Sequence, residues 1–141
     1  MKKILCDMHI HSQSSHDSVS PVSVTAKACV EKGVSAFAIT DHCDIQYYES
    51  QNVPAIVNSS VLETEEAARE FLGKIKILKG VEIGEGIWNT DYTDKILSSH
   101  DFDVVISSVH AGQCTMLSNF TGKISSNNII DIFYYWQTLL I

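Results

Sequence analysis

Hydrophobic residues occur in short runs that alternate along the chain with longer amphipathic segments. The most continuous run, residues 34–40, is apolar at nearly every position, which is typical of a strand buried on both faces of a parallel sheet. Three further runs predict strands over residues 3–9, 74–83 and 102–109. Apolar positions at helical spacing predict helices over residues 21–32, 58–72, 90–99 and 128–141.

The residues at the ends of these segments support the alternation of strands and helices. Ser20 is a candidate N-cap with Pro21 in the first helical turn, and Gly33 and Gly73 follow the first two helices. Four strands that alternate with four helices predict an α/β fold with a parallel sheet. Functional groups in such folds gather at the carboxyl ends of the strands, so reactive residues are expected where each apolar run stops.

Length and charge narrow the classes of function. The 141 residues suffice for one compact domain, which we assign to residues 1–141. Ten basic residues against 17 acidic ones give a net charge of −7, which argues against a basic groove for long nucleic acid and against a polybasic membrane patch. Arg69 is the single arginine, so this sequence excludes a site that binds phosphate through several arginines.

The cysteines indicate the cellular compartment. The sequence has four cysteines and no CxxC pair, and the apolar stretch after Met1 is too short for a signal peptide or a membrane span. We therefore expect free thiols and a cytoplasmic protein.

The first predicted strand ends in a pattern of alternating polar residues. Asp7, His9 and His11 are each two residues apart, which in an extended strand places them on one face. Two imidazoles on one face can bind one ion or two adjacent ions, and Asp7 is a candidate to orient one of the rings from behind.

The other three strands also end in residues that can bind metals. The second ends in Asp41 and His42, where Asp41 either orients a neighbouring ligand or caps the following turn. The third ends in Glu82, which is suited to bridge two cations or to act as a general base, and the fourth ends in His110. We expect Glu85 to be solvated.

Two more candidates lie elsewhere. The loop after the first strand contains His16 and Asp17, either of which could reach over the strand ends, and we favour Asp17 as the ligand. His100 precedes the fourth strand, at the opposite end of the sheet, and is expected to be structural or to face solvent.

The coincidence of these residues predicts a metal centre. Mixed nitrogen and oxygen ligands suit Zn, Mn or Fe ions better than Ca or Mg. Adjacent divalent ions lower the pKa of a shared water and neutralise charge on a phosphoryl oxygen, which suits the hydrolysis of a phosphate ester. Metal ions would then replace the arginines that the sequence lacks.

The ordered motifs Asp7-x-His9-x-His11, Thr40-Asp41-His42, Gly80-Val81-Glu82 and Ser108-Val109-His110 resemble the PHP (polymerase and histidinol phosphatase) superfamily. The likeness is greatest to its histidinol-phosphatase-like branch, which acts in histidine biosynthesis. The resemblance implies a distorted (β/α)7 TIM-like barrel and the hydrolysis of small phosphomonoesters such as histidinol phosphate at up to three divalent ions. Glu82 would bridge two ions, and Glu82 and His110 are the candidate catalytic residues. The implied metal ligands are His9, His11, Asp17, His42, Glu82 and His110.

The chain departs from the family pattern after its fourth strand. A late Asp-x-His motif and a phosphate-binding arginine are absent from the sequence, and such barrels generally need about 200 residues or more. We therefore expect the chain to form the N-terminal four βα units of the barrel, truncated at the C-terminus. An open barrel edge would favour association as a homodimer.

Two other functions remain compatible with these motifs. The first is a nucleotide phosphoesterase of another PHP branch, because the acidic charge argues against long nucleic acid but not against a mononucleotide. The second is a non-catalytic remnant or interaction module that still binds one or two metal ions.

Overall fold

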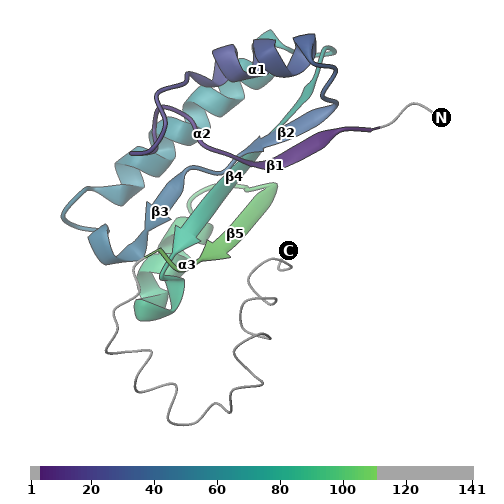
Figure 1. Cartoon of the computed structure of the whole chain (residues 1–141). Coiled ribbons are helices and arrows are strands. Elements are labelled where there is room, and N and C mark those ends of the chain that lie inside the picture. The colour runs from purple at the N-terminus through teal and green to yellow at the C-terminus, as the bar shows by residue number, and fades with distance from the viewer. Residues whose placement is uncertain (1–3, 111–141) are drawn as a thin grey trace, which may run out of the picture.

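The computed structural model describes residues 4–110, which form a parallel sheet with helices between the strands (Figure 1). The predicted helix over residues 128–141 lies outside the described residues. The helices and strands are β1 (Cys6–Ile10), α1 (Val22–Glu31), β2 (Ala36–Ile39), β3 (His42–Asp44), α2 (Val53–Glu70), β4 (Lys76–Gly84), α3 (Thr90–Leu97) and β5 (Val104–Ser108), with short 3-10 turns at Ile45–Tyr47 and Gly86–Trp88.

Strands β2 and β3 pair with β4 one after the other, as two segments of a single interrupted strand. Ala36 of β2 pairs with Lys76, and His42 of β3 pairs with Glu82, the same number of residues farther along both strands. The interruption falls at Thr40 and Asp41. Every pairing is parallel, with β1 beside β2 and β5 on the other side of β4. The described chain thus contains the four strand positions that the sequence predicts, with β1 and β5 at the edges.

Two hydrophobic clusters join the helices to one face of the sheet. The first joins α1 and α2 to β2 and β4, and the second joins α2 and α3 to β3 and β4. Val81 and Ile83 of β4 belong to the second cluster, so Glu82 between them points to the opposite face. The opposite face of the sheet, which none of the helices within residues 4–110 covers, is therefore the one that can carry a site.

Several boundaries differ from the predictions. The first strand spans Cys6–Ile10 instead of residues 3–9, and Pro21 occupies the N-cap position expected for Ser20. Helix α2 begins at Val53, five residues earlier than predicted, because Asn52 adopts a left-handed conformation with φ 51° and Pro54 fits the first turn. Gly33 and Gly73, with φ of 72° and 79°, follow α1 and α2 as expected.

Within residues 4–110, the helices are too short or too polar for any of them to cross a membrane.

Candidate metal centre

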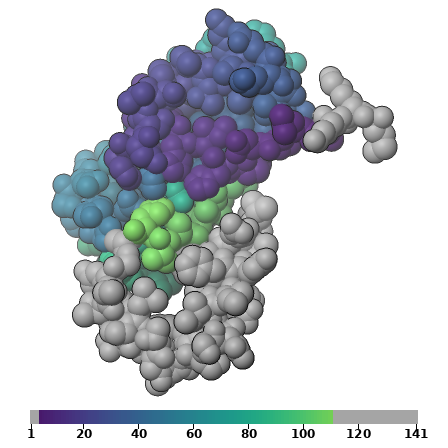
Figure 2. Space-filling view, in the orientation of Figure 1, coloured from purple at the N-terminus to yellow at the C-terminus, as the bar shows by residue number. Residues whose placement is uncertain are grey.

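Four histidines and a glutamate converge at the carboxyl ends of the strands. His9 lies in β1 and His11 just beyond it, His42 begins β3, Glu82 is near the end of β4, and His110 follows β5. Figure 2 shows the N-terminal segment, in purple, beside the last described residues, in green, although most of the chain separates them in sequence. The parallel sheet therefore assembles residues from four strand ends into one group, as the sequence predicts.

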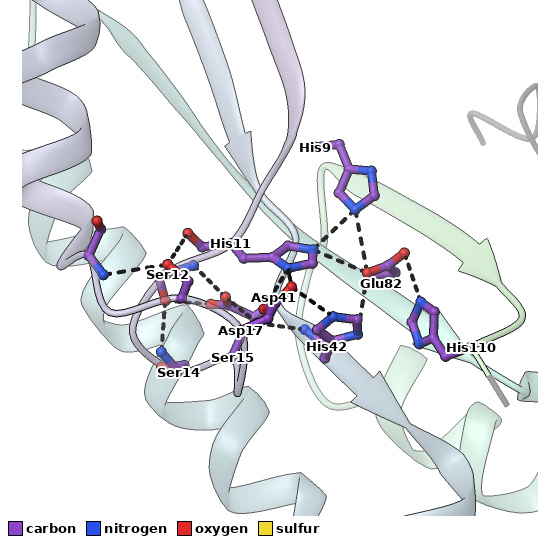
Figure 3. A network of polar contacts seen from close by, with 12 residues as sticks. His9, His11, Ser12, Ser14, Ser15, Asp17, Asp41, His42, Glu82 and His110 are labelled. Carbon is purple, nitrogen blue, oxygen red and sulfur yellow. Dashed lines mark hydrogen bonds and ion pairs between the residues drawn. The ribbon is translucent and has the colours of Figure 1, made fainter.

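Glu82 is the hub of this group (Figure 3). Its side chain is 5% exposed, and its Oε2 atom lies 3.1 Å from Nε2 of His11 and 3.4 Å from both Nε2 of His9 and Nδ1 of His42. Its Oε1 atom lies 3.2 Å from Nε2 of His110. One carboxylate thus contacts all four histidines, which is the arrangement expected of a residue that bridges metal ions.

The loop after β1 adds a second carboxylate. Both oxygens of Asp17 lie 3.0 Å from Nδ1 of His11, and Oδ2 lies 3.4 Å from Nε2 of His42. The ring of His16 packs beside that of His42 with 4.6 Å between centroids. Asp17 therefore approaches two predicted ligands, whereas His16 groups with His42 and Asp44, their ligand atoms within 4.8 Å of one another. The choice of Asp17 stays a prediction.

The group has the features of a site built for cations. Nε2 of His9 and Nε2 of His11 face each other at 3.1 Å. Nδ1 of His42 and Oε2 of Glu82 are buried and lie 3.4 Å apart, without a hydrogen bond of good geometry among the described residues. Three sets of predicted ligands place their donor atoms within 4.8 Å of one another: His9, His11 and Glu82; His11, Asp17 and His42; and His42, Glu82 and His110. Imidazole nitrogens and carboxylate oxygens suit Zn, Mn or Fe, so the residues present fit divalent ions.

The electrostatics of the site follow from the same contacts. Burial alone would raise the pKa of Glu82, but the surrounding histidines, His11 first, lower it to about 2. Contact with Glu82 outweighs burial and, together with Asp17, raises the pKa of His11 to about 9. Burial lowers the pKa of His42. Glu82 is therefore held ionised, while His42 favours the neutral form that binds metals.

Two acidic residues at the site were not predicted. Oδ1 of Asp44, in β3, lies 2.7 Å from Nδ1 of His110, and Oε1 of Glu85 accepts the backbone N–H of His110 at 2.5 Å. Glu85 is 1% exposed, so the expectation that it is solvated was wrong. A carboxylate on the far nitrogen of a histidine is a usual means of orienting a metal-binding ring, so Asp44 is suited to aim Nε2 of His110 at Glu82.

The two aspartates expected to support the ligands contact groups other than the ligand rings. Asp7 accepts the backbone N–H of His9 at 3.2 Å, where we expected it to reach a ring. One extra residue of β1 lies between the pairs Asp7–Phe37 and Ile10–Ile39, and this bulge interrupts the alternation that would place Asp7 with the histidines. Asp41 is buried and contacts serine residues.

Comparison with known proteins agrees with this geometry. The model of the PHP domain matches residues 7–139. The histidinol-phosphatase of Lactococcus lactis is 30% identical over 110 residues, which cover 78% of this chain and 40% of that protein. A probable histidinol-phosphatase of Deinococcus radiodurans is 26% identical over 113 residues, which cover 75% of this chain and 42% of the relative. The chain thus spans about two fifths of the length of these relatives.

Other matches show how widely the domain is used. The DNA polymerase/3'-5' exonuclease PolX of Bacillus subtilis is 34% identical over 110 residues, which cover 74% of this chain and 18% of that protein. The crystal structure of the Lactococcus lactis histidinol phosphate phosphatase, in complex with Zn, L-histidinol and phosphate, matches with a TM-score of 0.60 and 30% identity, over 77% of this chain and 41% of that one. The described sheet has the half-barrel arrangement that the family resemblance implies. The chain belongs to the PHP domain family, in its histidinol-phosphatase-like branch.

Proposed function

We propose that the chain carries the metal centre of a metal-dependent phosphomonoesterase of the histidinol-phosphatase type. The observation that carries this proposal is the convergence of four imidazoles on the two oxygens of Glu82. The likeness of the chain to a histidinol phosphate phosphatase solved with Zn, L-histidinol and phosphate supports a small phosphorylated substrate. Histidinol phosphate is the proposed substrate.

Each predicted ligand has a role in this proposal. Glu82 would bridge two ions. The site would hold up to three ions, and each of the other ligands would bind one or two of them. These ligands are His9, His11, Asp17, His42 and His110. Divalent ions bound here would supply an activated water near neutral pH and would neutralise charge on the phosphoryl group. Zn, Mn and Fe all fit the donor set.

The two proposed catalytic residues differ in what they can do. The contacts of both Glu82 oxygens with four imidazoles favour a bridging role for this carboxylate over that of general base. Burial lowers the pKa of His110, but contacts with Asp44 and Glu82 raise it overall. With its Nδ1 held by Asp44, His110 presents Nε2 to Glu82 and to the hydroxyl of Ser108, 2.8 Å away.

A cavity beside His42 offers room for the alcohol part of a substrate. It has a volume of about 230 Å³ and is lined by His16, His42, Asp44 and side chains of the loop after β1 and the start of α2. Because His42 lines this cavity and also contacts Glu82, a phosphoester could place its phosphate at the ligands and its polar remainder in the cavity.

Metal analysis and phosphatase assays on the full chain test the proposal. We expect two or three bound ions and release of phosphate from histidinol phosphate and from an aryl phosphate, with both lost in His9→Ala and kept in the control His100→Ala. One weakly bound ion without turnover would support a metal-binding remnant instead. Faster hydrolysis of a nucleotide would favour the nucleotide phosphoesterase that the similarity to PolX suggests.

Two further predictions concern the state of the protein. A cytoplasmic location agrees with the free thiols of Cys6, Cys29 and Cys43, and it stays a prediction. A homodimer through the sheet edges at β1 or β5 also stays a prediction, and a monodisperse 15.6 kDa species in light scattering would contradict it.

A further inference from the structure

A buried carboxylate next to the ligand cluster is surrounded by serine residues. Asp41 lies between β2 and β3 and is 3% exposed. Ser12 donates its backbone N–H and its hydroxyl to Asp41 at 2.6 Å each, Ser15 donates its hydroxyl at 2.7 Å, and Ser60 of α2 donates its hydroxyl at 2.5 Å. A carboxylate has about four acceptor positions, so these uncharged donors fill the capacity of Asp41.

The two serines of the loop after β1 are fixed in direction by further contacts. The hydroxyl of Ser15 accepts the backbone N–H of His42 at 3.0 Å, and the hydroxyl of Ser12 accepts that of Ser14 at 3.2 Å. Each hydroxyl therefore donates its single proton to Asp41 and accepts a backbone N–H with a lone pair. Replacing the Asp41 carboxylate by a group that donates would reverse these directions and loosen the loop.

The two loop serines that donate to Asp41 are close in sequence to predicted metal ligands, and so is Asp41 itself. Ser12 directly follows His11, Ser15 precedes Asp17 by two residues, and His42 directly follows Asp41 itself. The carbonyl of Asp41 also accepts the backbone N–H of Glu82 at 3.1 Å. Asp41 is thus joined to His11, Asp17, His42 and Glu82 through one or two links each, and its described side-chain hydrogen bonds all go to serine residues (Figure 3).

Asp17 depends most on this support. Its side chain is 46% exposed and lies in a loop, in contrast to the ligands on strands. The turn that carries it is closed by the backbone N–H of Ser18, which donates to the carbonyl of Ser15 at 3.4 Å. This turn follows directly on the turn from Ser12 to Ser15, closed at 3.0 Å by the two residues that Asp41 holds. A ligand on a loop binds an ion more tightly when the loop is already ordered before the ion arrives, because less entropy is then lost on binding.

We propose that Asp41 is a positioning residue of the metal centre, which holds residues 12–17 so that Asp17 lies against His11 and His42. This inference rests on the proposed metal-binding function. Asp41 would touch neither the ions nor the substrate, and its effect would reach the site through Ser12 and Ser15.

Cobalt titration and hydrogen exchange of the full-length chain test this role. We expect Asp41→Asn to weaken Co²⁺ binding, followed by visible absorption, about 10–100-fold, as loss of a supporting contact behind a metal ligand typically does. Asp17→Asn should weaken Co²⁺ binding as well. The double variant Asp41→Asn/Asp17→Asn should have an affinity for Co²⁺ within about twofold of that of Asp17→Asn alone. In the metal-free chain, Asp41→Asn should speed amide exchange at Ser12 and His42.

Two further variants separate positioning from simple loss of stability. Ser15→Ala removes one link to the loop while leaving the carboxylate in place, so it should weaken Co²⁺ binding even if Asp41→Asn fails to fold. Val61→Ala truncates a side chain on α2 that is 4% exposed, one residue after Ser60. It should lower the thermal midpoint and leave Co²⁺ affinity unchanged.

The outcomes distinguish this role from the proposed function. Unchanged exchange and Co²⁺ affinity in Asp41→Asn would overturn the positioning role alone. A double variant whose loss equals the product of the two single losses would overturn the route through Asp17. A wild-type chain that binds no Co²⁺ would overturn the proposed metal centre and this role together.

Discussion

Replacing Glu82 by glutamine should change how the stability of the metal-free chain depends on pH. Oε2 of Glu82 lies 3.1 Å from Nε2 of His11, and these side chains are only 5% and 16% exposed. Contact with Glu82 is the main reason that the pKa of His11 rises from 6.5 to about 9, against the effect of burial. The histidines also lower the pKa of Glu82 to about 2, although burial would raise it.

The direction of the pH effect follows from these two values. A raised histidine pKa stabilises the folded chain fully below pH 6.5, and this contribution is lost as the pH rises towards 9. A lowered carboxyl pKa contributes above pH 4.5, and its contribution is lost as the pH falls towards 2. The change for His11 corresponds to at most about 3 kcal/mol. It is counted once, because both values describe mainly the same contact.

Urea unfolding in the presence of a chelator measures this contribution. Between pH 6.5 and pH 9 we expect the wild-type free energy of unfolding to fall by up to about 3 kcal/mol, and that of Glu82→Gln to fall much less. Glu65→Gln is the matched control, because Glu65 pairs with Lys79 on the surface at 2.9 Å. It should decline as the wild type does. A Glu82→Gln chain that declines as steeply as the wild type would refute the reasoning.

Three further predictions test other parts of the structure. His42→Ala should abolish most of the rise in thermal midpoint that Zn²⁺ produces, and His16→Ala should keep most of it, as a thermal scan with and without a chelator would show. Burial raises the pKa of the Cys43 thiol to about 12, so a thiol reagent at pH 8 should label exposed Cys6 and spare Cys43, as peptide mass analysis would show. Gly80→Ala should destabilise the fold by about 1–3 kcal/mol in urea unfolding, because a Cβ there would lie 2.8 Å from a backbone oxygen of β2.

The predicted fold follows from features that act over a few residues. The apolar run of residues 34–40 and the alternating pattern of β4 are local signals of strands, and they placed β2 and β4 within two residues of their observed bounds. Helix α2 was predicted too short because its first turn contains Pro54, which also occurs in loops. Only the burial of Val53 and Val57 against β3 and β4 shows that this turn belongs to the helix.

The ligand cluster was predictable for a related reason. In a parallel sheet every strand end lies on the same edge, so a histidine that closes an apolar run can be placed without knowing the rest of the fold. The roles of Asp44 and Glu85 could not be predicted in this way, because their contacts with His110 depend on how β3, β4 and β5 lie side by side. Asp44 and His110 are 66 residues apart, and no local pattern encodes such a pair.

The two buried carboxylates near the strand ends show why burial alone does not identify a metal ligand. Counted as whole residues, Asp41 and Glu82 are each 3% exposed, and a backbone hydrogen bond joins their chain segments. Asp41 faces hydroxyl and amide donors that use all its acceptor positions, which leaves it no means of binding an ion. Glu82 faces imidazole nitrogens, which can release their protons and turn their lone pairs to a shared cation. The neighbours of each carboxylate, more than its depth in the fold, thus assign Asp41 to holding the loop and Glu82 to the proposed chemistry.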